Sequence, residues 1–328
     1  MTFSSYPEIK TFRLEHMAEA SKDHFRINKL HDEIYKQVIL LALENTEKEF
    51  GPPPCPFSFF VTGSAGRSEQ SVWSDQDHGL IYLCHSTEAQ SYFLELGNEI
   101  SKGLFESGYP YCDGGVMASN PLWCKSISEW EKQLSSWLEE SSWESIRYLL
   151  IFLDARTLFG EKGNVNALKK QIFQMADHNH LRIKFLNNTM HYKKGINVLG
   201  RLLPETYGQH AGSLNIKEIG LFPYVNALRL MALKENLLET STLSRLESMS
   251  ETASSALGKD LYKQEFLKLL KYRLQLCDQT DYDSGHYLSL KGLTKEQTRE
   301  LKDMIKHGAA LFAAVRKLLE KEDSYGAK

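Results

Sequence analysis

The chain has 328 residues, of which 42% are hydrophobic and 25% charged, and its formal net charge is −3. This length can bury a full core and exceeds one ordinary domain, so two domains are expected. The weak negative charge argues against a nucleic-acid partner, and no apolar stretch approaches the roughly 18 residues of a membrane span or follows the pattern of a secretory signal. We therefore expect a cytoplasmic protein with no membrane partner.

The cysteines are odd in number, scattered, and form no C-x-x-C pair of the kind that zinc and redox sites use. They are Cys55, Cys84, Cys112, Cys124 and Cys277. The simplest expectation is that all five are reduced thiols.

The N-terminal part of the chain reads as a helix followed by two buried strands. Residues 20–50 carry apolar side chains at spacings of three and four, which predicts a helix with one buried face. That helix must end at Gly51-Pro52-Pro53-Pro54, since successive prolines lack backbone donors. The short apolar runs 56–63 and 78–84 are typical of buried strands.

A second helix is predicted over 87–106, and GYPYCDGGVM, residues 108–117, resembles a third strand that runs into a glycine turn. Ser126 and Glu129 form a capping box for the next helix. Another helix begins near residue 142, although the apolar run that follows it could instead hold a strand.

From about residue 165 onward the periodicity is helical, and Thr294 with Gln297 forms a capping box for the last helix. The helices are predicted over 165–176, 180–202, 218–238, 258–276 and 295–321. We expect an α+β fold with a small mixed sheet flanked by helices, followed by an all-helical domain. The expected boundaries are an N-terminal helical segment over 1–50, a sheet domain over 51–162 and a helical domain over 163–328.

Gly63 and Ser64 stand at the end of the first predicted strand and lead into a short helix. Glycine lets the backbone approach a ligand closely, and the first turn of a helix offers unpaired N–H groups to an anion. The serine hydroxyl adds a donor. This turn is suited to a phosphate group.

Asp75 and Asp77 precede and open the second predicted strand, where a spacing of two turns both side chains to the same face. Two like charges about 5 Å apart at an effective dielectric near 20 repel by roughly 3 kcal/mol, so a cation is expected between them. Mg²⁺ prefers one or two carboxylates together with phosphate oxygens. The pattern predicts a nucleoside triphosphate bound with Mg²⁺ or Mn²⁺ and a nucleotidyl transfer reaction.

These motifs carry a resemblance to a known family. The pattern G63-S64-x10-D75-x-D77 resembles the signature of the polymerase-β-like nucleotidyltransferase superfamily. GSAGRSEQSVWSDQDHGLIY is similar to its bacterial signal-transduction branch, which includes the PII uridylyltransferase and the glutamine synthetase adenylyltransferase. GYPYCDGGVMASNPLW is similar to a family of nucleotidyltransferases often fused to CBS domains, for which this chain has no room.

The resemblance implies that Gly63 and Ser64 hold the β- and γ-phosphates and that Asp75 and Asp77 ligate the metal. It gives Arg67 either a phosphate contact or a structural ion pair with Glu69. The superfamily also has a third carboxylate, for which two candidates stay open. Asp113 follows the third predicted strand, and Asp154 matches an acidic position of the uridylyltransferases but could instead pair with Arg156.

Two further residues are candidates for nucleotide contacts. Asn120 lies in the glycine-rich segment and either contacts the base or ribose or ends a β-turn before Pro121. Lys194 shares a predicted helix face with Lys184 and Asn188, and that face either meets the triphosphate or is solvated.

The resulting hypothesis is a metal-dependent enzyme that transfers NMP from ATP or UTP to an acceptor hydroxyl, with its active site in a cleft between the two domains. The resemblance favours a protein acceptor, in the manner of the PII uridylyltransferase. A nucleotide-binding sensor of weak activity and an aminoglycoside-type small-molecule nucleotidyltransferase remain as alternatives.

Overall fold

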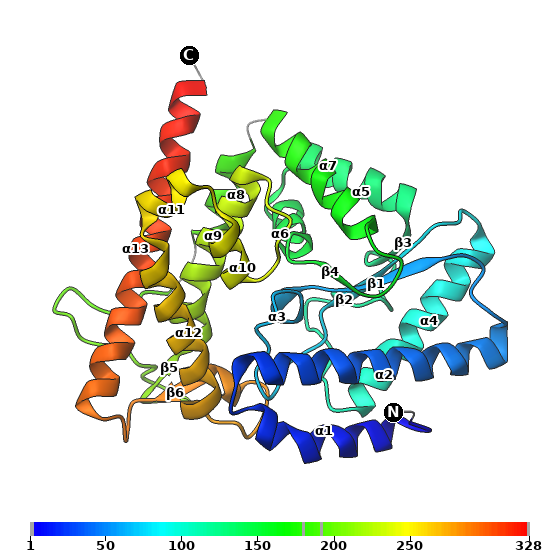
Figure 1. The fold of residues 1–328 in the computed structure, drawn as a ribbon, viewed down its shortest axis with the longest axis horizontal. Coiled ribbons are helices and arrows are strands. Elements are labelled where there is room, and N and C mark those ends of the chain that lie inside the picture. Colours follow the sequence, from blue (N-terminus) through cyan, green and yellow to red (C-terminus); the bar gives the residue numbers. More distant parts are fainter. Residues whose placement is uncertain (1–2, 179–180, 191–192, 327–328) are drawn as a thin grey trace. The chain divides into compact units, whose positions relative to one another are not determined.

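The computed structural model describes residues 3–178, 181–190 and 193–326. The chain divides into two compact units, the first comprising 1–139 with 151–172 and the second comprising 140–150 with 173–328. The first unit contains a small mixed sheet and the second is mainly helical (Figure 1). The expected α+β class is therefore confirmed. Among the described helices, none combines the length and apolar character that crossing a bilayer requires.

The sheet of the first unit has four strands in the order β3-β2-β1-β4. β1 (Phe57–Val61) pairs antiparallel with both β2 (His78–Tyr82) and β4 (Arg156–Gly160), and β2 pairs parallel with β3 (Cys124–Ser126). Both predicted strands are present. The ambiguous run after residue 142 contains both elements, helix α6 (Trp143–Phe152) and then β4.

Successive side chains of β1 point to opposite faces of the sheet, and each face has an apolar layer. The strand therefore lies between two sets of helices. Phe59 belongs to the core that the sheet shares with α2 (His24–Phe50) and α4 (Thr87–Glu106). Phe60 points to the opposite face, where its ring meets Trp130 of α5 (Ile127–Glu140) and Phe152. Figure 1 shows α2 and α4 on one side of the sheet, with α5 and α7 (Asn164–His178) on the other.

The predicted helix ends of the first unit have local causes. Asp23 caps α2 by accepting from the backbone N–H groups of Phe25 and Arg26, and Gly51 follows the helix with a φ of +81°. The predicted capping box is confirmed, because Ser126 N–H donates to Glu129 and Glu129 N–H donates to Ser126 Oγ. The expected helical segment over 1–50 contains a further helix before the one predicted over 20–50, namely α1 (Tyr6–Ala20), which packs on α2 and α4.

The prediction of a third strand over 108–117 is wrong. This segment is a chain of turns, and the third strand lies later, at β3. It makes two separate backbone hydrogen bonds to residues 76–78, at the start of β2: Gln76 N–H donates to Pro110 O, and His78 N–H donates to Val116 O. Proline and the Gly114-Gly115 pair break the continuous ladder that a strand would need.

The expectation of five reduced thiols is also wrong, because Cys55 and Cys84 form a disulfide. The cause lies in the strand register. Phe57 faces Tyr82 across the antiparallel pair β1–β2, and extending that register by two residues sets Cys55 opposite Cys84. The remaining three cysteines are free.

The second unit consists of short helices around α9 (Phe222–Glu235) and α13 (Lys295–Gly326). Tyr224 joins these two helices, since its hydroxyl donates to Met304 O at 2.8 Å and its ring lies against Gly308. The predicted capping box of Thr294 and Gln297 is confirmed. The other elements are α8 (Arg182–Thr189), β5 (Ser213–Asn215), the π-helix η1 (Lys217–Leu221), α10 (Thr242–Ser248), α11 (Glu251–Leu257), α12 (Lys259–Leu276), the 3-10 turn η2 (Ser284–His286) and β6 (Tyr287–Ser289).

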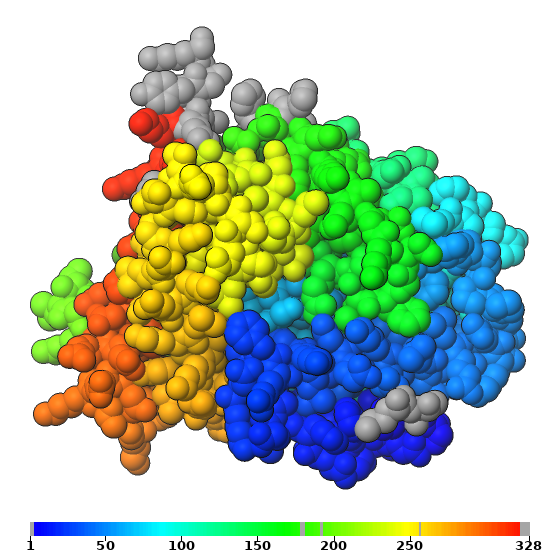
Figure 2. Space-filling view, in the orientation of Figure 1, coloured from blue at the N-terminus to red at the C-terminus, as the bar shows by residue number. Residues whose placement is uncertain are grey.

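Figure 2 shows side chains of α10 to α12, yellow to orange, as a continuous part of the surface of this unit. The helix predicted over 180–202 is too long, because α8 ends at Thr189 and residues 193–202 form turns and an isolated bridge between Ile196 and Leu202. Gly195 and Gly200 interrupt this stretch.

Candidate active site

The turn after β1 is built directly against Asp77. Thr62 N–H donates to Asp77 O at 2.9 Å, and Gly63 opens the four-residue helix α3 (Gly63–Gly66) with a φ of +56°. A Cβ added to Gly63 would lie only 2.2 Å from Asp77 Oδ2. Only glycine allows both this backbone conformation and this contact. Ser64, which is partly exposed on the same turn, lies 3.1 Å from the hydroxyl of Ser74.

Asp75 and Asp77 alternate with two buried polar residues on the approach to β2. Gln76 and His78 are fully buried, whereas both aspartates are partly exposed. Extended backbone turns alternate side chains to opposite sides, so anchoring one set inward presents the other set outward. The structure thus places the two carboxylates side by side, as their spacing predicts.

The inward side chains form a connected hydrogen-bond network. Ala118 N–H donates to His78 Nδ1, so the ring proton is on Nε2, which donates to Gln76 Oε1. Gln76 Nε2 in turn donates to the carbonyls of Ser101 and Tyr109. Burial lowers the pKa of His78 to about 3, so it is neutral at pH 7. His78 is therefore a structural anchor of the site.

Cys112 joins the two aspartates, which the sequence analysis did not anticipate. Among the described residues, one ligand atom each of Asp75, Asp77 and Cys112 lie within 4.8 Å of one another. Burial, and then the charge of Asp77, raise the pKa of the Cys112 thiol to about 12. Asp113 is exposed and is not a member of this group. In the sequence, Cys112 is the neighbour of the predicted ligand Asp113, and that adjacency was the signal that could have indicated the thiol.

The other candidate for the third carboxylate, Asp154, lies in a buried ion-pair cluster. Arg67 Nη1 donates to Asp154 Oδ2 at 2.6 Å, and Arg67 Nε donates to Glu69 Oε2 at 2.7 Å. Burial opposes the charged form of Arg67, yet the two carboxylates outweigh it and raise its pKa above the ordinary value. The structure therefore shows the ion pair that was one of the two readings of Arg67.

Asp154 does not pair with Arg156, the neighbour proposed from the sequence. Arg156 instead makes two hydrogen bonds to Asp32 of α2, at 3.0 and 2.5 Å, and two to the carbonyl of Ala65. Asp154 therefore holds Arg67, which follows α3, and Arg156 connects α3 with α2.

The two remaining candidates, Asn120 and Lys194, lie in a loop of the first unit and in the second unit. Asn120 uses both ends of its amide within its own loop, donating to Gly115 O and accepting from Leu122 N–H. These bonds form the turn that was the alternative to a contact between Asn120 and the base or ribose. Lys194 is an exposed residue of the second unit, beyond the end of α8, so it shares no helix face with Lys184 and Asn188. Asn188 donates to Trp143 O.

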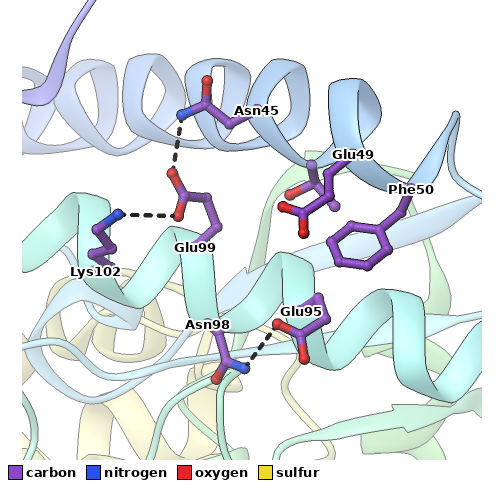
Figure 3. Close-up of a pocket in the computed structure, with 8 residues that line it drawn as sticks. Asn45, Glu49, Phe50, Glu95, Asn98, Glu99 and Lys102 are labelled. Atoms are coloured by element: carbon purple, nitrogen blue, oxygen red, sulfur yellow. Dashed lines mark hydrogen bonds and ion pairs between the residues drawn. The ribbon is translucent and has the colours of Figure 1, made fainter.

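A pocket of about 330 Å³ lies elsewhere in the first unit, between α2 and α4 (Figure 3). Its polar groups bond mainly to one another, as in the pairs Asn45–Glu99 and Lys102–Glu99. Glu49 and Glu95 also line it, and such a set of carboxylates repels a triphosphate. None of its lining residues belongs to the cluster of Asp75, Asp77 and Cys112.

The cluster fits a single divalent cation. Ligand atoms lie about 2.0 to 2.6 Å from such an ion, so two ligands of one ion are at most about 5 Å apart. The span of 4.8 Å is within that limit. The two carboxylates and the thiol could hold an ion next to the turn at Gly63, whose α-carbon lies against Asp77.

Two family models match the chain. Residues 11–144 match the family described as "Putative nucleotidyltransferase DUF294", and this range includes Gly63, Asp75, Asp77 and Cys112. Residues 179–318 match "Putative nucleotidyltransferase substrate binding domain". A search of curated proteins gave no match. The chain thus carries a domain of the family described as putative nucleotidyltransferases, followed by the domain described as that family's substrate-binding domain.

Proposed function

We propose that the protein transfers a nucleoside monophosphate from a metal-bound nucleoside triphosphate to a hydroxyl group. The observation that carries this proposal is the convergence of Asp75 and Asp77 beside Gly63. It lies inside the region that matches the nucleotidyltransferase family.

The proposed roles follow from position and charge. Asp75 and Asp77 would hold the divalent ion, while Gly63 and Ser64 would face the phosphate tail. When bound, the ion would neutralise charge on the phosphate oxygens. The acceptor hydroxyl loses its proton to solvent, its oxygen forms a bond to the α-phosphorus, the bond from that phosphorus to the bridging oxygen breaks, and pyrophosphate leaves. His78 and Gln76 keep the two carboxylates in position from behind.

We further propose that the acceptor is a protein hydroxyl, in the manner of the PII uridylyltransferase, and that the nucleotide is ATP or UTP. The support for this step is the similarity of residues 63–82 to the bacterial signal-transduction branch. Arg67 has a structural role in this proposal, since its guanidinium lies between Glu69 and Asp154.

Label transfer tests the function. Each of the four ribonucleoside triphosphates, labelled on the α-phosphate, is incubated with Mg²⁺ or Mn²⁺, the protein and a lysate of the host. The proposal predicts one labelled protein band with wild type and none with Asp75→Ala. Release of pyrophosphate without a labelled protein would indicate a small acceptor, and label that persists in Asp75→Ala would refute the site.

The thiol in the cluster favours one other candidate, a sensor that binds nucleotide and turns it over poorly. The superfamily that residues 63–77 resemble has a third carboxylate, whereas the third member of this cluster is Cys112. Metal-dependent nucleotide binding with no pyrophosphate release in the same assay would support the sensor.

A further inference from the structure

Cys112 occupies the place in the cluster where a third protein ligand is expected. The inference drawn from it rests on the proposed function, because it concerns the ion that Asp75 and Asp77 would hold. Its Sγ is the third of the ligand atoms that lie within 4.8 Å of one another. The three residues come from two segments, one on each side of α4 in the sequence.

The loop that carries Cys112 is held on both sides of the thiol. Before it, Pro110 O accepts from Gln76 N–H at 3.1 Å, and after it Val116 O accepts from His78 N–H at 3.0 Å. Cys112 O itself accepts from Gly115 N–H at 3.0 Å, which closes a turn. Gln76 and His78, whose N–H groups hold this loop, alternate with Asp75 and Asp77 along the chain. The segment 75–78 therefore positions all three ligand atoms.

Asp154 and Asp113 are the two carboxylates that were candidates for the third ligand, and neither belongs to the cluster. Asp154 is fully buried and is bonded to Arg67 at 2.6 Å. Asp113 is exposed and lies outside the group of ligand atoms. Cys112 is thus the residue that the described geometry brings to the ion.

We propose that the Cys112 thiolate is the third protein ligand of the metal ion held by Asp75 and Asp77, and that it shifts the preference of the site from Mg²⁺ toward thiophilic divalent ions such as Zn²⁺, Co²⁺ and Cd²⁺. Mg²⁺ takes oxygen ligands, whereas thiolates favour softer ions. Binding releases the thiol proton to solvent, and the three donors then carry a formal charge of −3 against the +2 of the ion.

The first test is a Cd²⁺ titration of the full chain followed by ultraviolet absorption, since a Cd–thiolate bond gives a charge-transfer band. Wild type should show the band with one ion per chain. Cys112→Ser, which keeps the size of the side chain, should lose the band and bind Cd²⁺ at least about tenfold more weakly. Its Mg²⁺ affinity should stay within about twofold, so the ratio of the two affinities changes.

The second test needs no change at Cys112, because it maps alkylation of the native thiols by iodoacetamide with mass spectrometry. All five cysteines lie among the described residues, and Cys112 is the free one that is partly exposed, while Cys124 and Cys277 are buried. Cd²⁺ or Zn²⁺ should protect Cys112 by at least about tenfold, and this protection should disappear in Asp75→Asn. Mg²⁺ should protect it much less.

The outcomes separate this inference from the proposed function. Mn²⁺ binding that depends on Asp75, with no Cd–thiolate band and no protection of Cys112, would overturn the inference and leave the proposed function standing. Absence of any divalent-ion binding that depends on Asp75 would overturn both. A band that disappears in Cys112→Ser and weakens in Asp75→Asn would support both.

Discussion

The α-carbon of Gly63 lies so close to the carboxylate of Asp77 that an added Cβ would be 2.2 Å from Oδ2. This contact links the turn that is proposed to face the phosphates with the residue that is proposed to hold the metal. The main chain reinforces it, since Thr62 N–H donates to Asp77 O. A substitution at Gly63 therefore tests the geometry of the site without removing a ligand.

Gly63→Ala should displace Asp77 and weaken metal binding at least about tenfold, by analogy with the loss of groups that orient metal ligands. The positive φ of +56° adds a backbone cost of about 1 to 2 kcal/mol. Mn²⁺ binding and urea unfolding measure the two effects separately.

Gly51→Ala is the matched control, because Gly51 is in the same unit, has a φ of +81°, and has no atom within 4 Å of an added Cβ. It should cost a similar amount of stability and leave metal binding unchanged. Equal metal affinity in both variants would contradict the proposed contact.

Lowering the pH should destabilise the first unit through two buried histidines. Burial, and for His31 also the charge of Arg13, lowers the pKa of His31 and of His78 to about 3. The unfolded chain binds these protons below about pH 6.5, whereas the folded chain binds them only near pH 3. The free energy of unfolding that the two neutral histidines contribute is therefore fully present above pH 6.5. It is lost as the pH falls, by about 2 kcal/mol per histidine between pH 6.5 and 5.

Urea unfolding at several pH values checks this slope. His31→Gln should reduce the pH dependence by about one proton. A slope that is identical in wild type and His31→Gln would show that His31 does not titrate as its burial implies.

Asp154→Ala should destabilise the protein by about 3 kcal/mol, since it leaves the buried Arg67 with one of its two carboxylate partners. Asp32→Ala is a suitable comparison, because its pair with Arg156 is partly exposed and should contribute about 1 kcal/mol. Chemical denaturation of both variants gives the two free energies of unfolding. Similar costs for the two would argue against burial as the source of the difference.

Opening the disulfide should lower stability without abolishing metal binding. Cys55 and Cys84 are separated by 29 residues, and a cross-link of that span is worth about 3 kcal/mol through the entropy of the unfolded chain. Urea unfolding of Cys55→Ser, compared with wild type in the presence and absence of dithiothreitol, measures this contribution. Wild type under reducing conditions should unfold like the variant, and insensitivity of wild type to dithiothreitol would show that the bond does not form.

The sequence predicted the parts of the fold that local patterns control. Short apolar runs located β1 and β2, and the Ser126–Glu129 and Thr294–Gln297 pairs located two helix starts. The spacing of Asp75 and Asp77 was also sufficient to place them side by side, because an extended segment turns alternate residues to the same side.

The remaining features depend on contacts between distant segments. The Cys55–Cys84 bond follows from the β1–β2 register, and the position of Cys112 follows from hydrogen bonds to Gln76 and His78. Neither can be read from residue types nearby. The pair of Asp154 with Arg156, which was one of the alternatives for Asp154, does not form for the same reason, since its partner Arg67 is 87 residues away in the chain.

Equilibrium binding of a nucleoside triphosphate in the presence and absence of Mn²⁺ tests the central proposal most directly. Wild type, Asp75→Asn, Asp77→Asn and the double variant are compared, with Glu131→Gln, an exposed carboxylate of α5, as a control for the loss of one charge. We predict binding that requires the metal, falls by about a hundredfold or more in either single variant, and falls little further in the double variant. Nucleotide binding that is independent of the metal and equal in all five proteins would contradict the proposed site.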